Sequence, residues 1–343
     1  MRSLTDKLNT QKKLSFDEWK EIIQNGDRPY TAGIARKITD KSFGNRIYIR
    51  GLIEVSNVCR NNCLYCGIRR ENNVSPFRLN KNDVMQCCEN GYKLGFRTFV
   101  LQGGEAGWYS TSKIAEIVSE IKSRYPDCAV TLSLGEMERD DYQKLFDAGA
   151  DRYLLRQEAA SCELYEKIHP TEMSHSHRIK ALHNLKEIGF QTGCGLMVGV
   201  PHQTVSHLAE DMMFMQEFNP HMIGIGPFMP AGGTPFEKSP PGDGELTLHI
   251  LSLCRIMFPK SMLPATTALG SLLPDGRIKA IIAGANVVMP NLTPEENRGN
   301  YLLYDNKIGT KGAPEDGLTA LKTDLEKIGF EIEVTRGDYC NNE

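Results

Sequence analysis

Three cysteines within eight residues are the strongest indication of chemistry in this sequence. Cys59, Cys63 and Cys66 form a C-x3-C-x2-C pattern, and thiolates are soft ligands that suit zinc or iron–sulfur clusters. A structural zinc site needs a further ligand, and the sequence has no second C-x2-C or H-x3-H pair to supply it. A cubane cluster bound by three cysteines keeps one iron open to another ligand. We therefore interpret the motif as a reactive cluster site. The alternative is a zinc-stapled binding protein without catalysis.

A polar face is predicted on one strand, over residues 152–158. Side chains alternate between the two faces of a strand, so Arg152, Arg156 and Glu158 share one face and Gln157 lies on the other, outward face. Arginine and glutamate side chains inside a barrel must be paired or bound to a ligand, because an unpaired buried charge is strongly destabilising. The alternative is that these residues face solvent or pair only with one another.

Two other predicted strands end in residues that could contact a ligand. Gly103 and Gly104 precede Glu105, and glycine lets a backbone approach a ligand closely. A tight turn would explain the two glycines equally well. On the next strand Thr131 and Ser133 share a face by the same alternation. A threonine is common in strands and needs no functional explanation.

Predicted strands and helices alternate strictly around these motifs. The expected strands cover 47–55, 98–102, 129–134, 152–158, 192–200, 222–228, 263–269 and 286–289. The expected helices cover 82–94, 113–122, 140–148, 177–188, 207–218, 246–258, 275–283 and 318–328. Alternation indicates a parallel sheet, and eight repeats favour a closed (βα)8 TIM barrel, an α/β fold, over a doubly wound open sheet. The cysteine loop follows the first strand, which places it at the mouth, where barrel active sites lie.

The chain divides into three predicted parts. Residues 1–45 are expected to form an N-terminal helical extension, with a capping box at Ser15 and Glu18. Residues 46–310 are expected to form the barrel, and residues 311–343 a C-terminal helical segment that closes it.

Composition narrows the class of partner. The chain has 343 residues, 40 basic and 43 acidic, so there is no basic excess to favour nucleic acid or an anionic membrane. The N-terminus lacks the apolar core of a signal peptide, and we expect a cytoplasmic protein without a membrane span. His169, His175 and His177 are expected to be surface residues.

The segment 54–70, with Tyr65 before the last cysteine of the motif, resembles the radical S-adenosylmethionine (radical SAM) superfamily. Further blocks make the chain similar to the HydE family of [FeFe]-hydrogenase maturation proteins. These blocks are 131–136, 151–156, 197–201, 224–228, 264–268 and 286–291. Biotin synthase and methylornithine synthase are the related families whose chemistry competes with this interpretation.

The resemblance implies a [4Fe–4S] cluster on the three cysteines and SAM chelating the open iron. It assigns SAM binding to Tyr65, Gly103, Gly104, Glu105, Ser133, Glu158 and Arg178. It assigns a substrate cavity to Thr131, Arg152, Arg156, Thr266, Thr267, Met289, Tyr301 and Tyr304. Some members bind a second cluster near the C-terminus. Here 309–342 contains one cysteine, Cys340, so no second cluster is predicted.

The resemblance also implies the reaction. A 5′-deoxyadenosyl radical would act on a small sulfur-containing precursor, an iron–carbonyl–cyanide–cysteine complex supplied by the maturase HydG. The product would pass to the scaffold HydF, and the cluster built would be the diiron part of the hydrogenase H-cluster. The alternative within the superfamily is a mutase or sulfur-insertion enzyme similar to methylornithine or biotin synthase.

Overall fold

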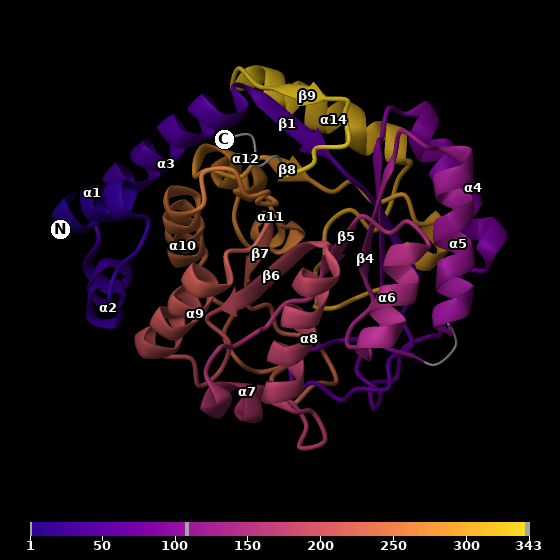
Figure 1. Cartoon of the computed structure of the whole chain (residues 1–343), viewed down its shortest axis with the longest axis horizontal. Coiled ribbons are helices and arrows are strands. Elements are labelled where there is room, and N and C mark those ends of the chain that lie inside the picture. The colour runs from indigo at the N-terminus through magenta and orange to yellow at the C-terminus, as the bar shows by residue number, and fades with distance from the viewer. Residues whose placement is uncertain (1, 107–109, 340–343) are drawn as a thin grey trace.

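Six parallel strands lie side by side in sequence order and form most of a barrel wall (Figure 1). The computed structural model describes residues 2–106 and 110–339. The six strands are β2 (Gly51–Ser56), β3 (Thr98–Gly103), β4 (Ala129–Ser133), β5 (Arg152–Leu154), β6 (Gln191–Val198) and β7 (Met222–Pro227). A second sheet has the order β8-β1-β9 and contains β1 (Arg46–Ile49), β8 (Val287–Val288) and β9 (Glu331–Glu333).

The second sheet and two short bridges complete the barrel. A parallel bridge joins Met222 of β7 to Met262, and another joins Pro264 to Val287 of β8. Strand β8 then pairs in parallel with β1, which leads directly into β2. The strand order therefore returns to its starting point, which confirms the closed TIM-barrel architecture and not the open doubly wound sheet.

Helices surround the barrel and extend it at the N-terminus (Figure 1). The longer outer helices are α4 (Lys81–Lys93), α5 (Thr111–Arg124), α6 (Arg139–Asp147), α8 (His175–Ile188), α9 (Val205–Phe218) and α10 (Gly244–Met257). The shorter ones are α7 (Cys162–Ile168), α11 (Thr267–Leu272), α12 (Gly276–Ile282) and α13 (Glu295–Arg298). The N-terminal helices are α1 (Arg2–Gln11), α2 (Phe16–Asn25) and α3 (Arg28–Phe43), and α14 covers Pro314–Lys327. Helix α2 packs on α9 and α3 packs on α10. The predicted capping box at Ser15 and Glu18 is confirmed.

Three strand predictions were wrong in detail. The first predicted strand is interrupted at Arg50, where β1 ends and β2 begins. Strand β5 ends at Leu154, and Glu158 has φ 63°, which breaks the alternation on which its predicted face depended. The predicted strand 263–269 makes only single bridges, because α11 starts at Thr267.

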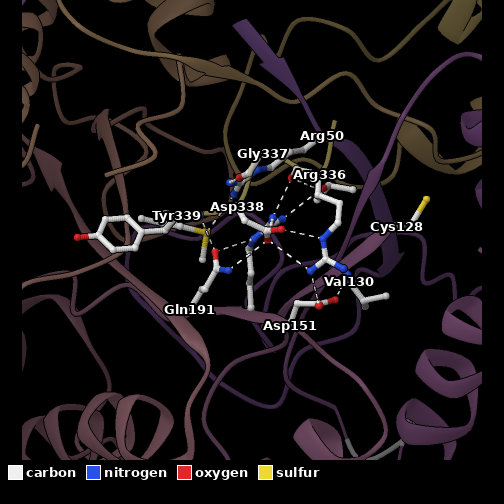
Figure 2. A network of polar contacts seen from close by, with 12 residues as sticks. Arg50, Cys128, Val130, Asp151, Gln191, Arg336, Gly337, Asp338 and Tyr339 are labelled. Carbon is white, nitrogen blue, oxygen red and sulfur yellow. Dashed lines mark hydrogen bonds and ion pairs between the residues drawn. The ribbon is translucent and has the colours of Figure 1, made fainter. Parts of the chain in front are cut away.

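The C-terminal residues cross the amino end of the barrel as β9 and an irregular segment, whereas the sequence predicts a helical segment there. Strand β9 pairs with β1, and the residues after it accept hydrogen bonds from Thr98 of β3 and from Gln191 of β6, the second of which is drawn in Figure 2. Asp338 accepts hydrogen bonds from Arg336 Nε at 2.7 Å and from Gln191 Nε2 at 3.1 Å. Arg336 also binds Asp151, the residue directly before β5, at 2.6 Å. This segment therefore closes the end of the barrel opposite the cysteine loop.

None of the helices that the structure describes combines the length with the apolar character needed to cross a bilayer. The helices and strands instead share one large buried cluster. It includes Ile53 of β2, Leu132 of β4, Leu182 of α8 and Ile250 of α10, which are all fully or almost fully buried. This core holds the strand ends that carry the polar residues described next.

Candidate functional site

The three cysteines lie at the carboxyl end of β2, in the loop that leads to α4. All three are free and partly buried. Burial raises the pKa of each thiol, that of Cys66 to about 12. Cys63 Sγ also lies 3.7 Å from the sulfur of Met173, so the loop is covered by apolar as well as polar side chains. Three half-buried thiols at the mouth of a barrel form a donor set suited to a soft metal centre.

The chemistry of three thiols on one short loop suits an iron–sulfur cluster. Within residues 2–106 and 110–339, no three His, Cys, Asp or Glu side chains converge on a point where one metal ion could bind. Each cysteine of a cubane site binds a different iron, so the sulfurs need not converge. Cys59, Cys63 and Cys66 would be the ligands of such a cluster, on one short loop.

The glycines after β3 bring the strand end against this loop. A Cβ atom on Gly104 would lie 2.4 Å from the carbonyl oxygen of Val58 and 2.9 Å from Cβ of Cys59. A Cβ on Gly103 would lie 3.1 Å from Val55. The Gly104 N–H donates to the Ser56 carbonyl at 3.0 Å. A side chain at position 104 would displace the cysteine loop, so the glycine has a steric explanation here.

Glu105 lies over the next strand end and is held there on both sides. Its Oε1 accepts a hydrogen bond from the Glu136 backbone N–H at 3.0 Å, and its Oε2 lies 3.4 Å from Arg60. A Cβ on Gly135, whose φ is 82°, would lie 2.0 Å from Cγ of Glu105. Ser133, at the end of β4, lies two residues before this glycine and is half-buried. The predicted residues Glu105 and Ser133 therefore come from neighbouring strand ends.

A buried arginine from α8 reaches the same side of the mouth. Arg178 Nε donates to a carboxylate oxygen of Glu136, and its Nη1 donates to the carbonyl of Arg156 at 2.6 Å. Arg178 is 7% exposed, so it is not an ordinary surface arginine. Glu136, which the sequence did not single out, is its charge partner.

The mouth is hollowed beside Glu105 and Glu136. A cavity of about 850 Å³ is lined by residues that include Arg60, Glu105, Glu136, Met173 and His177. Cavities of this size hold ligands of the size of a nucleotide or a drug.

Arg156 and Glu158 face one another although they are not on a regular strand. Nη2 of Arg156 and Oε2 of Glu158 form an ion pair at 3.0 Å, and Nε of Arg156 has no hydrogen-bond partner among the described residues. The hydroxyls of Thr131 and Thr266 are also buried without such a partner in the described part of the chain. Buried polar atoms normally have partners, so this group indicates a place for a polar ligand.

Tyr65 binds a histidine that was expected on the surface. The Tyr65 hydroxyl lies 3.0 Å from Nε2 of His169, and Nδ1 of His169 lies 3.0 Å from the Tyr165 carbonyl. His169 is 3% exposed, so the surface prediction was wrong for it, whereas His175 and His177 are partly exposed. Burial, helped by the charge of Arg178, lowers the pKa of His169 to about 3. The ring is therefore neutral, and the carbonyl requires the proton to be on Nδ1.

The remaining predicted cavity residues come from the last third of the chain. Thr267 begins α11, directly after Thr266. Tyr301 is 2% exposed and its hydroxyl accepts a hydrogen bond from Gln102 at 3.2 Å. Tyr304 lies beside Arg277, and burial raises the pKa of its hydroxyl to about 12.

Two predicted cavity residues have other neighbours. Met289 packs against the apolar cluster of Met222, Met262 and Val287, as expected of a core residue. Arg152 differs from its prediction more strongly. It is fully buried at the start of β5, and Thr98, Asp338 and other protein groups bind its guanidinium. The structure therefore places it at the closed amino end and not beside Arg156.

Asp211 of α9 is another polar residue that was not anticipated. It is fully buried, and its Oδ1 accepts hydrogen bonds from Gln157 Nε2 at 3.1 Å and from the Ala160 N–H at 2.8 Å. A signal was present in the sequence, because Asp211 occupies the apolar stripe that Leu208 and Met215 define by helical spacing.

The chain matches known proteins over most of its length. Residues 53–215 match the model of the Radical SAM superfamily. The chain is 43% identical over 311 residues to the [FeFe] hydrogenase maturase subunit HydE of Thermotoga maritima, a match that covers 90% of this chain and 88% of that protein. It is 28% identical over 313 residues to the 3-methylornithine synthase of Methanosarcina barkeri, over 89% and 87% of the two chains. The crystal structure of methylornithine synthase (PylB) superimposes with a TM-score of 0.84, 25% identity and coverage of 96% and 97%.

Proposed function

Since this chain belongs to the radical SAM superfamily and, within it, to the HydE family, we propose that it matures the active site of [FeFe]-hydrogenase. The observation that carries the proposal is the 43% identity to a HydE protein over nine-tenths of the chain. The protein is a radical SAM enzyme with a [4Fe–4S] cluster and SAM as cofactors. When bound, the two supply a 5′-deoxyadenosyl radical.

We assign the cluster to Cys59, Cys63 and Cys66 on the evidence of their chemistry and position. The half-buried thiols lie at the mouth, and Gly104 packs directly on their loop. Glycine at this position keeps the loop close to the strand end that carries Glu105. This packing supports a role for Gly103, Gly104 and Glu105 in holding SAM beside the cluster.

The charges around the mouth suit the two ends of the methionine part of SAM. Its ammonium group would be bound by the carboxylates of Glu105 and Glu158, and its carboxylate would be bound by Arg178. Arg178 is buried and already bound to Glu136, so its guanidinium is held in one orientation. Tyr65 is held by His169 and Ser133 ends β4 nearby, which supports their assignment to the same site.

The substrate would lie deeper in the barrel, beside two buried hydroxyls that have no hydrogen-bond partner among the described residues and a guanidinium that is paired with Glu158. Thr131, Thr266 and Arg156 contribute these groups. Such donors suit a polar or anionic ligand, in agreement with a small iron–carbonyl–cyanide–cysteine precursor. Thr267, Tyr301, Tyr304 and Met289 are proposed for the wall of this cavity. The assignment of Arg152 to this cavity has less support, because protein groups bind its guanidinium.

We further propose HydG as the supplier of this precursor and HydF as the acceptor of the product, in the cytoplasm. A maturation assay tests this directly. Apo-hydrogenase is incubated with HydG, HydF and this protein, and hydrogen evolution is compared with the same mixture lacking this protein. The proposal predicts activity only in the complete mixture. Equal activity without this protein would refute the maturation function.

The cluster is tested separately. Anaerobically reconstituted wild-type protein should contain about four iron atoms per chain and should convert SAM to 5′-deoxyadenosine when reduced. Cys63→Ala should lose both properties. Cys162→Ala removes an exposed cysteine of α7 and serves as the matched control. Retention of the cluster spectrum by Cys63→Ala would refute the ligand assignment.

A mutase similar to methylornithine synthase is the second candidate, favoured by the TM-score of 0.84 over nearly the whole chain. Formation of 3-methylornithine by the reduced, SAM-loaded protein would support it. A protein that completes hydrogenase maturation and forms no 3-methylornithine would exclude it.

A further inference from the structure

Asp211 lies behind the proposed SAM site and outside the barrel interior. Its helix, α9, covers the outer side of the wall, and the Asp211 side chain is fully buried there. A single carboxylate oxygen, Oδ1, accepts both the Gln157 side-chain N–H and the Ala160 backbone N–H. The other oxygen, Oδ2, has no hydrogen-bond partner among the described residues. Removing a carboxyl group from water costs free energy, and here only one of its oxygens accepts hydrogen bonds from residues that the structure describes. The presence of Asp211 at this position therefore needs an explanation.

The two donors bracket Glu158 in the sequence. Gln157 precedes it and Ala160 follows it by two residues, so Asp211 binds the chain on both sides of Glu158. The Gln157 side chain also accepts a hydrogen bond from the Gly195 N–H at 2.7 Å, and the Glu158 N–H donates to the Gly195 carbonyl at 3.1 Å. The segment is therefore bound to both α9 and β6.

This binding compensates for an unfavourable backbone conformation. Glu158 has φ 63°, in the left-handed region that costs an ordinary residue of order 1 kcal/mol or more. That conformation turns the chain so that the Glu158 carboxylate meets Arg156 at 3.0 Å while Gln157 points toward α9. Without the bonds to Asp211, the segment would lose two of the contacts that favour the left-handed turn.

We propose that Asp211 is a positioning residue for SAM binding: through Gln157 and Ala160 it holds the backbone conformation that presents the Glu158 carboxylate to the cofactor. This inference rests on the proposed assignment of Glu158 to SAM. Asp211 itself does not touch the ligand. Its contribution is pre-organisation, because a carboxylate held in place loses less conformational freedom on binding.

The neutral form of the Asp211 side chain can perform this role. Burial raises the pKa of Asp211 to about 7, opposed by the hydrogen bonds from Gln157 and Ala160 and reinforced by Glu158 and Glu210. An asparagine oxygen can accept the same two hydrogen bonds as Oδ1. Leucine has the same branching at Cγ, is larger, and cannot accept either bond.

The test compares Asp211→Asn with Asp211→Leu. Each protein is reconstituted anaerobically, its iron is counted, and its affinity for SAM alone is measured by isothermal titration calorimetry. We expect Asp211→Leu to keep the cluster and to bind SAM about 10-fold more weakly, equivalent to about 1.4 kcal/mol. Asp211→Asn should bind within about 3-fold of the wild type. Glu217→Leu removes an exposed carboxylate from the same helix and is the matched control.

Two results would overturn the proposal: a folded Asp211→Leu protein with wild-type affinity, or an Asp211→Asn protein as weak as the leucine variant. If Asp211→Leu does not fold, the variant Gln157→Met tests the positioning role instead. It removes one of the two donors and should weaken SAM binding several-fold, and unchanged affinity would refute the positioning role.

Glu158→Ala separates this proposal from its premise. If that variant binds SAM normally, the assignment of Glu158 is wrong and the proposal fails with it. If Glu158→Ala is weak and Asp211→Leu is normal, only the role of Asp211 is wrong.

Discussion

The ammonium group of Lys307 lies 2.5 Å from the carboxylate of Glu54, and both side chains are buried. Glu54 belongs to β2, directly before the cysteine loop, whereas Lys307 follows the segment that carries Tyr301 and Tyr304. Lys307 also donates to the Tyr301 carbonyl at 2.8 Å. This ion pair therefore fastens the segment proposed to wall the substrate cavity to the first half of the barrel.

Lys307→Met should destabilise the protein strongly, because it leaves Glu54 as a buried charge without its cation. Removal of one partner of a buried pair costs about 3–5 kcal/mol, and urea unfolding of the folded protein would measure it. Lys327→Met is the control, because both it and its partner Asp324 are exposed and the loss of stability should be much smaller. Similar losses in the two variants would contradict the importance of the buried pair.

Gly104→Ala should loosen the cluster without unfolding the barrel. The added methyl group would lie 2.4 Å from the Val58 carbonyl and 2.9 Å from Cys59, so the cysteine loop must move. We expect faster loss of iron from the reconstituted protein, measured as release to a chelator. Gly33→Ala is the control, because no atom lies within 4 Å of its added Cβ, and an alanine in helix α3 should be neutral or stabilising. Equal iron release from both variants would contradict the steric explanation.

The barrel could be predicted because strand and helix periodicity are local properties of a sequence. Residues 98–103 and 205–218, for example, lie within one or two residues of their predicted ends. The cysteine loop also followed from local spacing and its position after a strand. Glu158 shows the limit of this reasoning. Alternation predicted its face, yet its left-handed backbone depends on Asp211, more than 50 residues away in the sequence.

Arg152 shows a second limit. Its sequence neighbours suggested a place beside Arg156, but its partner Asp338 is 186 residues away, in a segment predicted to be helical. A segment of three strand residues followed by an irregular end has too little periodicity to be recognised. The partners of a buried charge are set by the tertiary structure. They determine whether an arginine faces a ligand or is bound by the protein.

His169 should remain neutral throughout the physiological pH range, with its proton on Nδ1. The folded-state pKa of about 3 lies below the ordinary value of 6.5. The folded state therefore binds fewer protons than the unfolded state between these values, and stability should fall as the pH falls below about 6.5. NMR of the imidazole nitrogens checks the tautomer directly. An imidazolium signal from His169 at pH 5 would contradict this assignment.

Tyr65→Phe tests the hydrogen bond between the Tyr65 hydroxyl and the His169 ring. It removes the donor to His169 Nε2, which is buried, so the free energy of unfolding should fall by about 1–3 kcal/mol. Tyr30→Phe removes an exposed hydroxyl that bonds Asp6, and its loss should be smaller. A Tyr65→Phe protein as stable as the wild type would show that the hydrogen bond from Tyr65 to His169 Nε2 does not stabilise the fold.

Asp338 should make the C-terminal segment sensitive to acid. Burial opposes its ionisation, but Arg336 and Arg152 outweigh that effect and lower the pKa of Asp338 to about 2, from the ordinary 3.8. Because the folded pKa is the lower one, the stabilisation from this charge is complete above about pH 4 and is lost as the pH falls to about 2. Unfolding free energies measured across that interval should therefore fall more steeply for the wild type than for Asp338→Asn.

At neutral pH the same variant should be less stable by about 1–2 kcal/mol, because the amide leaves the fully buried Arg152 without its counter-charge while still accepting a hydrogen bond. Asp324→Asn, on the exposed face of α14, controls for the loss of a paired carboxylate. Parallel pH profiles for wild type and Asp338→Asn would contradict the lowered pKa. Since Asp338 binds Arg152 of β5, a steeper wild-type profile would also mean that the residues after β9 are fastened to the barrel by charge.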